Sequence, residues 1–303
     1  MKALVTGGAG FIGANLAITL ERKGAKVIVL DDFSSGDYRN LVGFKSDVVA
    51  ESIKEVDLKR FKDVDAIFHQ AAITDTTVRD QKLMMQVNVE GFRRILEFAV
   101  RLGIPFVYAS SAGTYGNISG PQKEEMAGHP VNIYGFSKWI CDNIAREYMQ
   151  KTDSLIIGLR YFNVFGPKEA HKGKMASMIW QLANQMKARQ RPRIFKWGEQ
   201  KRDQVYVKDV VHANLLALKA KRNGIVNIGS GQATTFNKII RVLNKVLGTK
   251  LEPEYIDNPY VGFYQDHTQA DLTLAQQIIN YSPQWEFEEA VKDYMKEVGF
   301  IEN

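Results

Sequence analysis

The sequence predicts an α/β fold: a doubly wound parallel sheet with a smaller, discontinuous α/β domain. Short apolar runs alternate with amphipathic stretches through the first half of the chain, and a glycine-rich turn follows the first run. Strands that alternate with helices are typical of βαβ units, whose right-handed crossovers put helices on both faces of a parallel sheet. The rhythm changes after Gly166-Pro167, which predicts that the chain leaves the sheet there.

Short apolar runs mark the predicted strands of the sheet, at residues 3–6, 26–30, 66–69, 106–109 and 155–160. After residue 166 the periodicity predicts one long helix over 175–189, followed by a loop. Short strands at 205–207 and 225–228 then indicate a return to the sheet. We therefore predict a larger domain made of residues 1–164 plus 203–229, and a smaller one made of residues 165–202 plus 230–303.

Composition limits the class of protein. The 303 residues carry a net charge of +6, from 40 Lys and Arg against 34 Asp and Glu, and the basic residues are spread along the chain. Such a distribution favours anionic small ligands over nucleic acid, which would require a basic stripe with interleaved aromatics. The single cysteine, Cys141, cannot form an internal disulfide, and we expect it to be buried.

The chain shows no targeting segment and no run of about 18 uncharged apolar residues. We therefore expect a cytoplasmic protein without a membrane partner, and we expect no metal site. The length suits one large domain or two modest ones.

The turn after the first predicted strand reads Gly7-Gly8-Ala9-Gly10-Phe11-Ile12-Gly13 and leads into a helical stretch over 15–23. Glycines in such a turn let the backbone approach a pyrophosphate, whose charge lies at the N-terminus of the helix. This placement predicts a Rossmann domain for the larger unit. We expect cofactor contacts at Gly7, Gly10, Phe11, Ile12 and Gly13.

Two acidic residues, Asp31 and Asp32, end the second predicted strand. A carboxylate at this point accepts hydrogen bonds from the adenosine ribose and repels a 2′-phosphate, which favours NAD over NADP. Arg39 and Lys45 lie close enough in sequence to offer a countercharge. The choice between NAD and NADP therefore stays open.

Tyr134 and Lys138 lie four residues apart, so in a helix they share one face. A nearby ammonium lowers the pKa of a tyrosine toward neutrality, which makes the phenol a usable acid or base for a hydroxyl that becomes a carbonyl. Two serines, Ser110 and Ser111, follow the predicted strand at 106–109. Because parallel strands bring their carboxyl ends to the cofactor crevice, we expect Ser111 to donate a hydrogen bond to the reacting oxygen.

The order of these motifs resembles that of the extended short-chain dehydrogenase/reductases, the NAD-dependent epimerase/dehydratase family, over essentially the whole chain. The resemblance implies a tightly bound NAD or NADP that is recycled within the catalytic cycle. It also implies cofactor contacts at Ala71, Ala72 and Asn88, beside those of Tyr134 and Lys138. Enzymes of this kind usually self-associate, so we expect a homo-oligomer.

Residues 160–177, Arg-Tyr-Phe-Asn-Val-Phe-Gly-Pro-Lys-Glu-Ala-His-Lys-Gly-Lys-Met-Ala-Ser, resemble one branch of this family. Its members invert C6 of ADP-D-glycero-D-manno-heptose to give ADP-L-glycero-D-manno-heptose, a precursor of the lipopolysaccharide inner core. By this resemblance a hydride leaves C6 for the nicotinamide, the carbonyl compound rotates, and the hydride returns to its opposite face. Tyr134 and Lys172 would be the two bases, with Lys138 tuning the tyrosine.

Lys172 can act as a base only if its amine is partly neutral, which requires desolvation or cationic neighbours. Lys168, His171 and Lys174 could be such neighbours. The alternative is a basic loop that holds the diphosphate, since basic side chains near a nucleotide-sugar usually contact its anionic groups.

For the smaller domain the resemblance implies binding of an ADP-sugar substrate at Asn163, Val164, Lys174, Gln181, Phe195, Arg202 and Tyr264. A guanidinium such as that of Arg202 can hold phosphate oxygens bidentately. The family commonly has a small hydroxyl residue in place of Lys174 and a histidine in place of Gln181. Whether these two residues alter the sugar that is accepted stays open.

Two other functions remain possible. Asp31-Asp32-Phe33-Ser34-Ser35-Gly36 resembles the UDP-hexose 4-epimerases, which have no need for Lys172. A sugar dehydratase would need an acidic pair beside Ser111, but Ala112 and Gly113 follow it. The other alternative is a non-catalytic NAD(P)-binding sensor, which the fold alone does not exclude.

Overall fold

The structure is a computed structural model that describes residues 1–78, 80–258 and 267–302. Its centre is a seven-stranded sheet in the order β11-β7-β5-β4-β1-β2-β3, in which every neighbouring pair is parallel. The strands are β1 (Lys2–Thr6), β2 (Lys26–Leu30), β3 (Asp47–Val49), β4 (Ala66–His69), β5 (Phe106–Ser111), β7 (Ile156–Tyr161) and β11 (Gly224–Ile228). The predicted doubly wound Rossmann sheet is confirmed.

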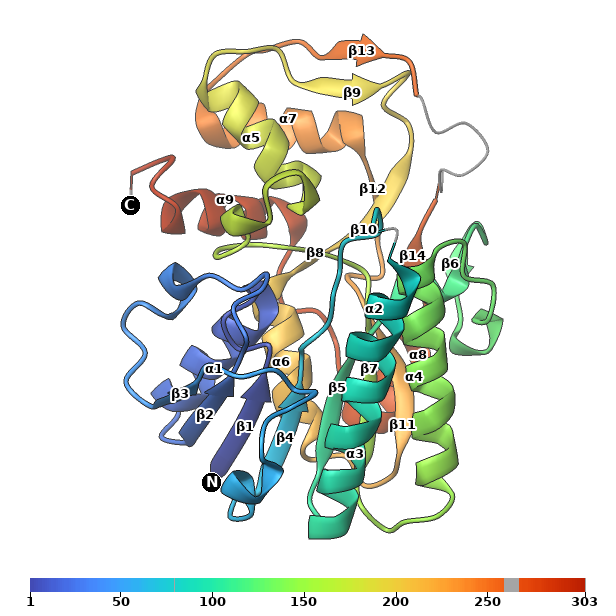
Figure 1. Cartoon of the computed structure of the whole chain (residues 1–303). Coiled ribbons are helices and arrows are strands. Elements are labelled where there is room, and N and C mark those ends of the chain that lie inside the picture. Colours follow the sequence, from blue (N-terminus) through green and yellow to red (C-terminus); the bar gives the residue numbers. More distant parts are fainter. Residues whose placement is uncertain (79, 259–266, 303) are drawn as a thin grey trace.

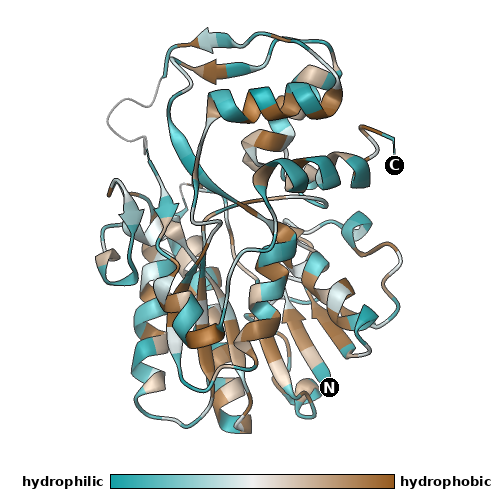
Figure 2. Ribbon diagram, turned by 180° about the vertical axis from the view of Figure 1, so that it is seen from behind, coloured by the Kyte–Doolittle hydropathy of each residue, from teal (hydrophilic) through white to brown (hydrophobic). Residues whose placement is uncertain are grey.

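Helices cover both faces of this sheet (Figure 1). One face packs against α1 (Phe11–Arg22), α6 (Val207–Ala217) and α8 (Thr273–Ile279), and the other against α3 (Gly91–Leu102) and α4 (Ile133–Met149). Alternate strand residues enter opposite cores: Ala3 and Val5 face the first group, and Leu4 faces the second. Strands buried on both faces need continuous apolar runs, which is the pattern that the sequence shows. In Figure 2 these strands are mostly brown, whereas the helices carry teal and brown stretches.

A second layer of structure lies beyond the carboxyl ends of the strands (Figure 1). Here α5 (Met178–Lys187), α7 (Phe236–Leu247) and α9 (Phe287–Glu297) share a separate apolar core. Strands β9 (Arg193–Phe195) and β13 (Glu254–Ile256) pair above these helices, and β8 (Asn163–Phe165), β10 (Lys201–Tyr206) and β12 (Ala233–Thr235) form a three-stranded sheet. The boundaries between the two predicted domains stay a prediction.

The remaining elements are short. They are the strands β6 (Pro121–Gln122) and β14 (Gln269–Ala270), the helix α2 (Gln81–Met85), the π-helical η3 (Gln86–Glu90), and the 3₁₀ helices η1 (Tyr38–Leu41), η2 (Leu58–Phe61), η4 (Ala112–Tyr115), η5 (Glu124–Met126) and η6 (Ala170–Met175).

Two predicted elements differ from the structure. The helix predicted from residue 175 begins at Met178, because Gly173 has a positive φ of 53° and Ser177 caps α5 by accepting a hydrogen bond from Trp180 N–H. The strand predicted at 205–207 is the end of β10, which pairs with β8 and β12 and does not rejoin the central sheet. The chain leaves β7 directly into β8, whose edge offers β10 a closer partner.

Cys141 is buried, as predicted, and burial raises the pKa of its thiol to about 12. Cys141 lies in α4, and the next residue, Asp142, ties this helix to the sheet. Asp142 accepts hydrogen bonds from Arg160 of β7 at 2.9 Å and from Tyr108 of β5 at 2.9 Å. Because the Arg160 and Asp142 side chains are fully buried, removal of either partner would leave an uncompensated charge.

Within the described ranges, no helix is long and apolar enough to cross a membrane.

Candidate active site

The glycine turn joins β1 to α1 and has room for backbone only. Gly7 has a positive φ of 66°, and a Cβ there would lie 2.6 Å from the Ala71 nitrogen. A Cβ on Gly13 would lie 2.0 Å from the Gly7 oxygen. Phe11 and Ile12 form the first turn of α1, where free backbone N–H groups and the helix dipole favour an anion. The turn therefore fits the pyrophosphate of a dinucleotide.

Replacing Gly10 by alanine is expected to lower the affinity for NAD by about tenfold, because a side chain would stand where the backbone approaches the pyrophosphate. The new Cβ meets little of the chain itself, with the Gly7 oxygen at 3.2 Å as its neighbour. The free energy of unfolding should therefore change by less than about 1 kcal/mol. Titration calorimetry with NAD and urea unfolding measure the two effects. Unchanged affinity for NAD would contradict this assignment of the turn.

The acidic pair after β2 has one buried and one exposed member. Asp31 accepts hydrogen bonds from the N–H groups of Ala9 and Phe33, both at 2.8 Å, and burial raises its pKa. Asp32 is exposed and bonded to Ser34. Asp31 thus ties the end of β2 to the glycine turn, where the ribose of a dinucleotide follows the pyrophosphate.

Arg39, one of the basic residues that could offer a countercharge to a 2′-phosphate, forms an ion pair with Asp37. Its guanidinium binds the Asp37 carboxylate, with Nη2 at 2.5 Å and Nε at 2.9 Å from Oδ2. This interaction lowers the pKa of Asp37 to about 2, so the pair is neutral overall at physiological pH. An Arg39 paired in this way offers little to a 2′-phosphate, which favours NAD.

Ser111, Tyr134 and Lys138 come together at the carboxyl end of β5. Ser111 ends the strand, and Tyr134 and Lys138 lie in the first two turns of α4. The Lys138 ammonium is buried and donates to the Ala109 carbonyl at 2.8 Å. A Cβ on Gly113 would lie 3.3 Å from Ser111 Oγ and 3.7 Å from Tyr134 Cε1, so both side chains border the same small space. The structure thus brings Ser111 and Tyr134 to one space at the end of β5, with Lys138 one turn further along α4; their part in proton exchange stays a prediction.

Asn88 supports this arrangement from the π-helical η3. Its side chain accepts a hydrogen bond from Ile73 N–H at 2.8 Å and donates to the Ile73 carbonyl at 2.9 Å and to Ser137 Oγ at 3.0 Å. Ser137 in turn donates to the Tyr134 carbonyl. The loop after β4, with Ala71 and Ala72, is thereby held against the start of α4. Direct contact between Asn88 and a cofactor stays a prediction.

His69 is expected to lower the free energy of unfolding as the pH falls from about 6.5 to about 3. Burial first, and the charge of Lys138 second, lower its pKa to about 3 in the folded protein. The unfolded chain binds this proton near pH 6.5, so stability falls by about 1.4 kcal/mol per pH unit within that window. Urea unfolding at pH 7 and pH 5 tests this against His69→Gln, in which that part of the pH dependence should vanish. Equal pH dependence in the two proteins would contradict it.

Lys172 lies in η6 with a largely buried side chain, and its ammonium lies 5.7 Å from the centre of the Phe11 ring. Burial lowers its pKa, while the negative charge of Glu169 partly opposes the shift. Of the two causes that the sequence left open, desolvation and cationic neighbours, desolvation is the one that lowers the pKa of Lys172. Lys174 is exposed, and Lys168 donates to the Asn40 carbonyl at 2.8 Å.

The residues predicted to contact the substrate fall into three groups. Asn163, Val164 and Arg202 belong to neighbouring strands β8 and β10 of the three-stranded sheet. Lys174 and Gln181 lie around the start of α5, where the Gln181 amide donates to the carbonyls of Lys174 at 3.1 Å and Ala176 at 2.8 Å. Phe195 ends β9, in a different sheet. Tyr264 lies outside the described residues.

The chain matches one protein family over most of its length. The pattern of the NAD dependent epimerase/dehydratase family matches residues 3–229. The chain belongs to this family. The family match and the solved structures show an NAD-dependent epimerase.

Solved structures of family members resemble the whole chain. ADP-L-glycero-D-manno-heptose-6-epimerase from Helicobacter pylori is 41% identical, with a TM-score of 0.92 over 99% of this chain and 96% of that one. UDP-glucose 4-epimerase from Thermotoga maritima is 31% identical, with a TM-score of 0.89 over 98% and 99%. UDP-N-acetylglucosamine 4-epimerase from Methanobrevibacter ruminantium is 28% identical, with a TM-score of 0.92 over 99% of both chains.

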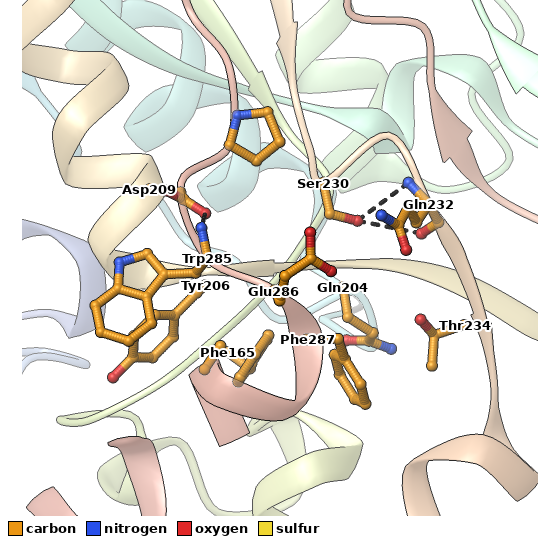
Figure 3. A pocket seen from close by; sticks show the side chains of 12 residues that line it. Phe165, Gln204, Tyr206, Asp209, Ser230, Gln232, Thr234, Trp285, Glu286 and Phe287 are labelled. Atoms are coloured by element: carbon orange, nitrogen blue, oxygen red, sulfur yellow. Dashed lines mark hydrogen bonds between the residues drawn. The ribbon is translucent and has the colours of Figure 1, made fainter. Parts of the chain in front are cut away.

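A small cavity of the epimerase lies apart from the predicted site (Figure 3). It measures about 30 Å³, far too little for a nucleotide-sugar, and none of the predicted site residues lines it. Asp209 borders it and accepts hydrogen bonds from the N–H groups of Gln284 and Trp285. Burial raises the pKa of this carboxyl to about 6.

Two residues near Lys172 were missed in the sequence. Glu169 is a fully buried carboxylate three residues before it, and Asn40 joins the glycine turn to the loop that carries it. A lone charged residue inside an otherwise apolar or basic segment, as Glu169 is, was the available signal. No such signal marked Asn40, because its partners Ala9, Lys168 and His171 are distant from it in the sequence.

Proposed function

We propose that this epimerase inverts C6 of ADP-D-glycero-D-manno-heptose to give ADP-L-glycero-D-manno-heptose, a precursor of the lipopolysaccharide inner core, in the cytoplasm. The observation that carries the proposal is Lys172, a partly buried lysine with a lowered pKa, whose ammonium lies 5.7 Å from the centre of the Phe11 ring beside the glycine turn. The likeness to the Helicobacter pylori enzyme over nearly the whole of both chains supports it.

Inversion at one carbon requires an acid or base on each side of it. NAD bound at the glycine turn would supply the oxidation and the reduction at C6. Tyr134 exchanges the proton of the C6 hydroxyl in one orientation, with Lys138 one helical turn away on the same face, and Ser111 donates a hydrogen bond to the reacting oxygen. After the 6-keto sugar turns, the Lys172 amine exchanges the proton in the other orientation. Reduction of the 6-keto sugar needs the ammonium form of Lys172, which gives a proton to the oxygen, and the reverse direction needs the neutral amine, which burial favours.

We also propose that residues 1–164 plus 203–229 bind the dinucleotide and that residues 165–202 plus 230–303 bind the ADP-sugar. Asn163 and Val164 end a segment of the first group and Arg202 ends a segment of the second, on the paired strands β8 and β10 that lie at the border between the groups. Their position beyond the carboxyl ends of the sheet strands supports this division, because ligands of doubly wound sheets bind there. We propose a homo-oligomer as the assembled form.

A substrate comparison tests the proposal. Purified protein, without added cofactor, is incubated in parallel with ADP-D-glycero-D-manno-heptose, UDP-glucose and UDP-galactose, and the sugar protons are followed by NMR. We expect inversion of C6 in the ADP-heptose and no change in either UDP-hexose. Inversion of C4 in a UDP-hexose alone would replace the proposal by a 4-epimerase. Bound nicotinamide without any turnover would favour a sensor.

A further inference from the structure

Glu169 is a fully buried carboxylate at the start of the loop that carries Lys172. It accepts hydrogen bonds from Gly166 N–H at 3.1 Å, from Ser177 N–H at 2.5 Å and Oγ at 2.8 Å, and from the Tyr294 hydroxyl at 3.0 Å. Two of these partners stand at the two ends of the loop, and the third comes from α9. The carboxylate therefore links the two ends of the loop at residues 166–177 and fixes the loop to α9, in the layer that α5, α7 and α9 form.

The other side of the same loop is attached to the dinucleotide-binding half. Asn15 of α1 donates to the Pro167 carbonyl at 2.9 Å, and Lys168 donates to the Asn40 carbonyl at 2.8 Å. The Asn40 amide lies 3.1 Å from His171 Nδ1 and also donates to the glycine turn. The loop thus spans the space between the two layers, held at both sides.

Lys172 stands between these two attachments. Its backbone N–H donates to the Glu169 carbonyl at 3.0 Å, and its ammonium lies beside Phe11. Glu169 is the charge that opposes the effect of burial on Lys172. The other titratable groups on the loop are Lys168, His171 and Lys174, and Tyr294 of α9 donates to Glu169. Burial lowers the pKa of Lys168, and His171 faces Asp37 and Arg39.

We propose that Glu169 is the positioning residue of Lys172: its carboxylate holds the 166–177 loop closed and supplies the negative charge that keeps the lysine able to take up a proton. Epimerisation runs in both directions, so a second base must accept the proton in one direction and return it in the other. Burial favours the neutral amine, which has no proton to return, and the negative charge of Glu169 opposes this effect. The inference rests on the proposed role of Lys172 as the second base.

The pKa of Lys172 itself is the direct readout, and it does not depend on turnover. In protein labelled with ¹³C-lysine, the Cε resonance of Lys172 is assigned by its loss in Lys172→Met and titrated with NAD bound. In Glu169→Gln we expect the pKa of Lys172 to fall by about one unit. The limb of the pH–rate profile that reports Lys172 should move to lower pH by the same amount. An unchanged pKa would overturn the proposal.

Tyr294→Phe is the matched control, because it removes one hydrogen bond to Glu169 and keeps the charge. We expect the pKa of Lys172 to stay within a few tenths of a unit of its wild-type value. A shift as large as that of Glu169→Gln would show that loop packing, and not charge, sets the pKa, and would overturn the proposal.

Should Glu169→Gln fail to fold, a reciprocal measurement replaces it, since electrostatic coupling acts equally on both groups. The pKa of the Glu169 carboxyl, read from ¹³C-glutamate, should rise in Lys172→Met relative to wild type. Equal values would contradict the coupling. If the wild type does not invert C6 but the pKa values of Lys172 and Glu169 depend on each other as expected, the result would contradict the proposed function alone.

Discussion

Replacing Tyr134 by phenylalanine is expected to reduce C6 epimerisation of ADP-D-glycero-D-manno-heptose by about 10³-fold, which is typical for removal of a general acid–base group. In the proposed mechanism the phenol exchanges the proton of the C6 hydroxyl, and the Tyr134 ring borders the space beside Gly113, where a Cβ would lie 3.7 Å from Cε1. The ring itself is retained, so the packing against Gly113 should persist. Initial rates by NMR and the amount of NAD that copurifies with the protein measure catalysis and cofactor binding separately.

Tyr148→Phe is the matched control for this change. Tyr148 lies near the other end of α4 and donates its hydroxyl to Glu97 at 2.8 Å, away from the site. We expect full epimerase activity in Tyr148→Phe. Tyr134→Phe activity within tenfold of wild type would remove Tyr134 from the catalytic set.

Replacing Lys172 by methionine is expected to reduce kcat by about 10³-fold with little change in KM. Methionine keeps most of the apolar stem that packs near Phe11 and removes only the amine. The alternative role of Lys172, a contact to the diphosphate, predicts the opposite division: KM rises while kcat stays within a few fold. The separate effects on kcat and KM therefore decide between a base and an anion contact.

The control for net charge is Lys151→Met, at an exposed lysine that pairs with Glu147 on the surface. It removes the same positive charge from the molecule at a distance from the site. We expect wild-type kcat and KM. A comparable loss in this variant would mean that the effect of Lys172→Met does not come from the site.

The sheet, the glycine turn and the Ser-Tyr-Lys set could be predicted because each depends on local pattern. Apolar runs of four to six residues with helical stretches between them specify parallel strands. The glycines of the turn follow from backbone geometry: a Cβ on Gly13 would meet the Gly7 oxygen at 2.0 Å. Residues four apart in a helix share one face, as Tyr134 and Lys138 do.

The loop around Lys172 could be predicted only in part, because its structure depends on distant contacts. The start of α5 is set by Ser177, whose cap is combined with a hydrogen bond to Glu169. Glu169 in turn needs Tyr294, which is 125 residues away in sequence. Periodicity over a local window carries no information on such partners, so the helix was predicted to begin too early.

The sequence left two causes open for a lowered pKa of Lys172, desolvation and cationic neighbours, and could not decide between them for a physical reason. Sequence neighbours suggested repulsion from Lys168, His171 and Lys174. In the fold these side chains turn to other partners or to solvent, and burial against α1 has the larger effect. Burial of a charged group is a property of the assembled layers, which a short segment does not reveal.

The most direct test of C6 inversion by an internally returned hydride uses ADP-D-glycero-D-manno-heptose with deuterium at C6. Purified protein is incubated with it in ordinary water without added NAD, and the product is examined by NMR and mass spectrometry. We predict ADP-L-glycero-D-manno-heptose that keeps the deuterium at C6, because the same hydride leaves and returns within one closed site. Product with hydrogen at C6, or recovery of unchanged substrate while a UDP-hexose is inverted at C4, would contradict this account.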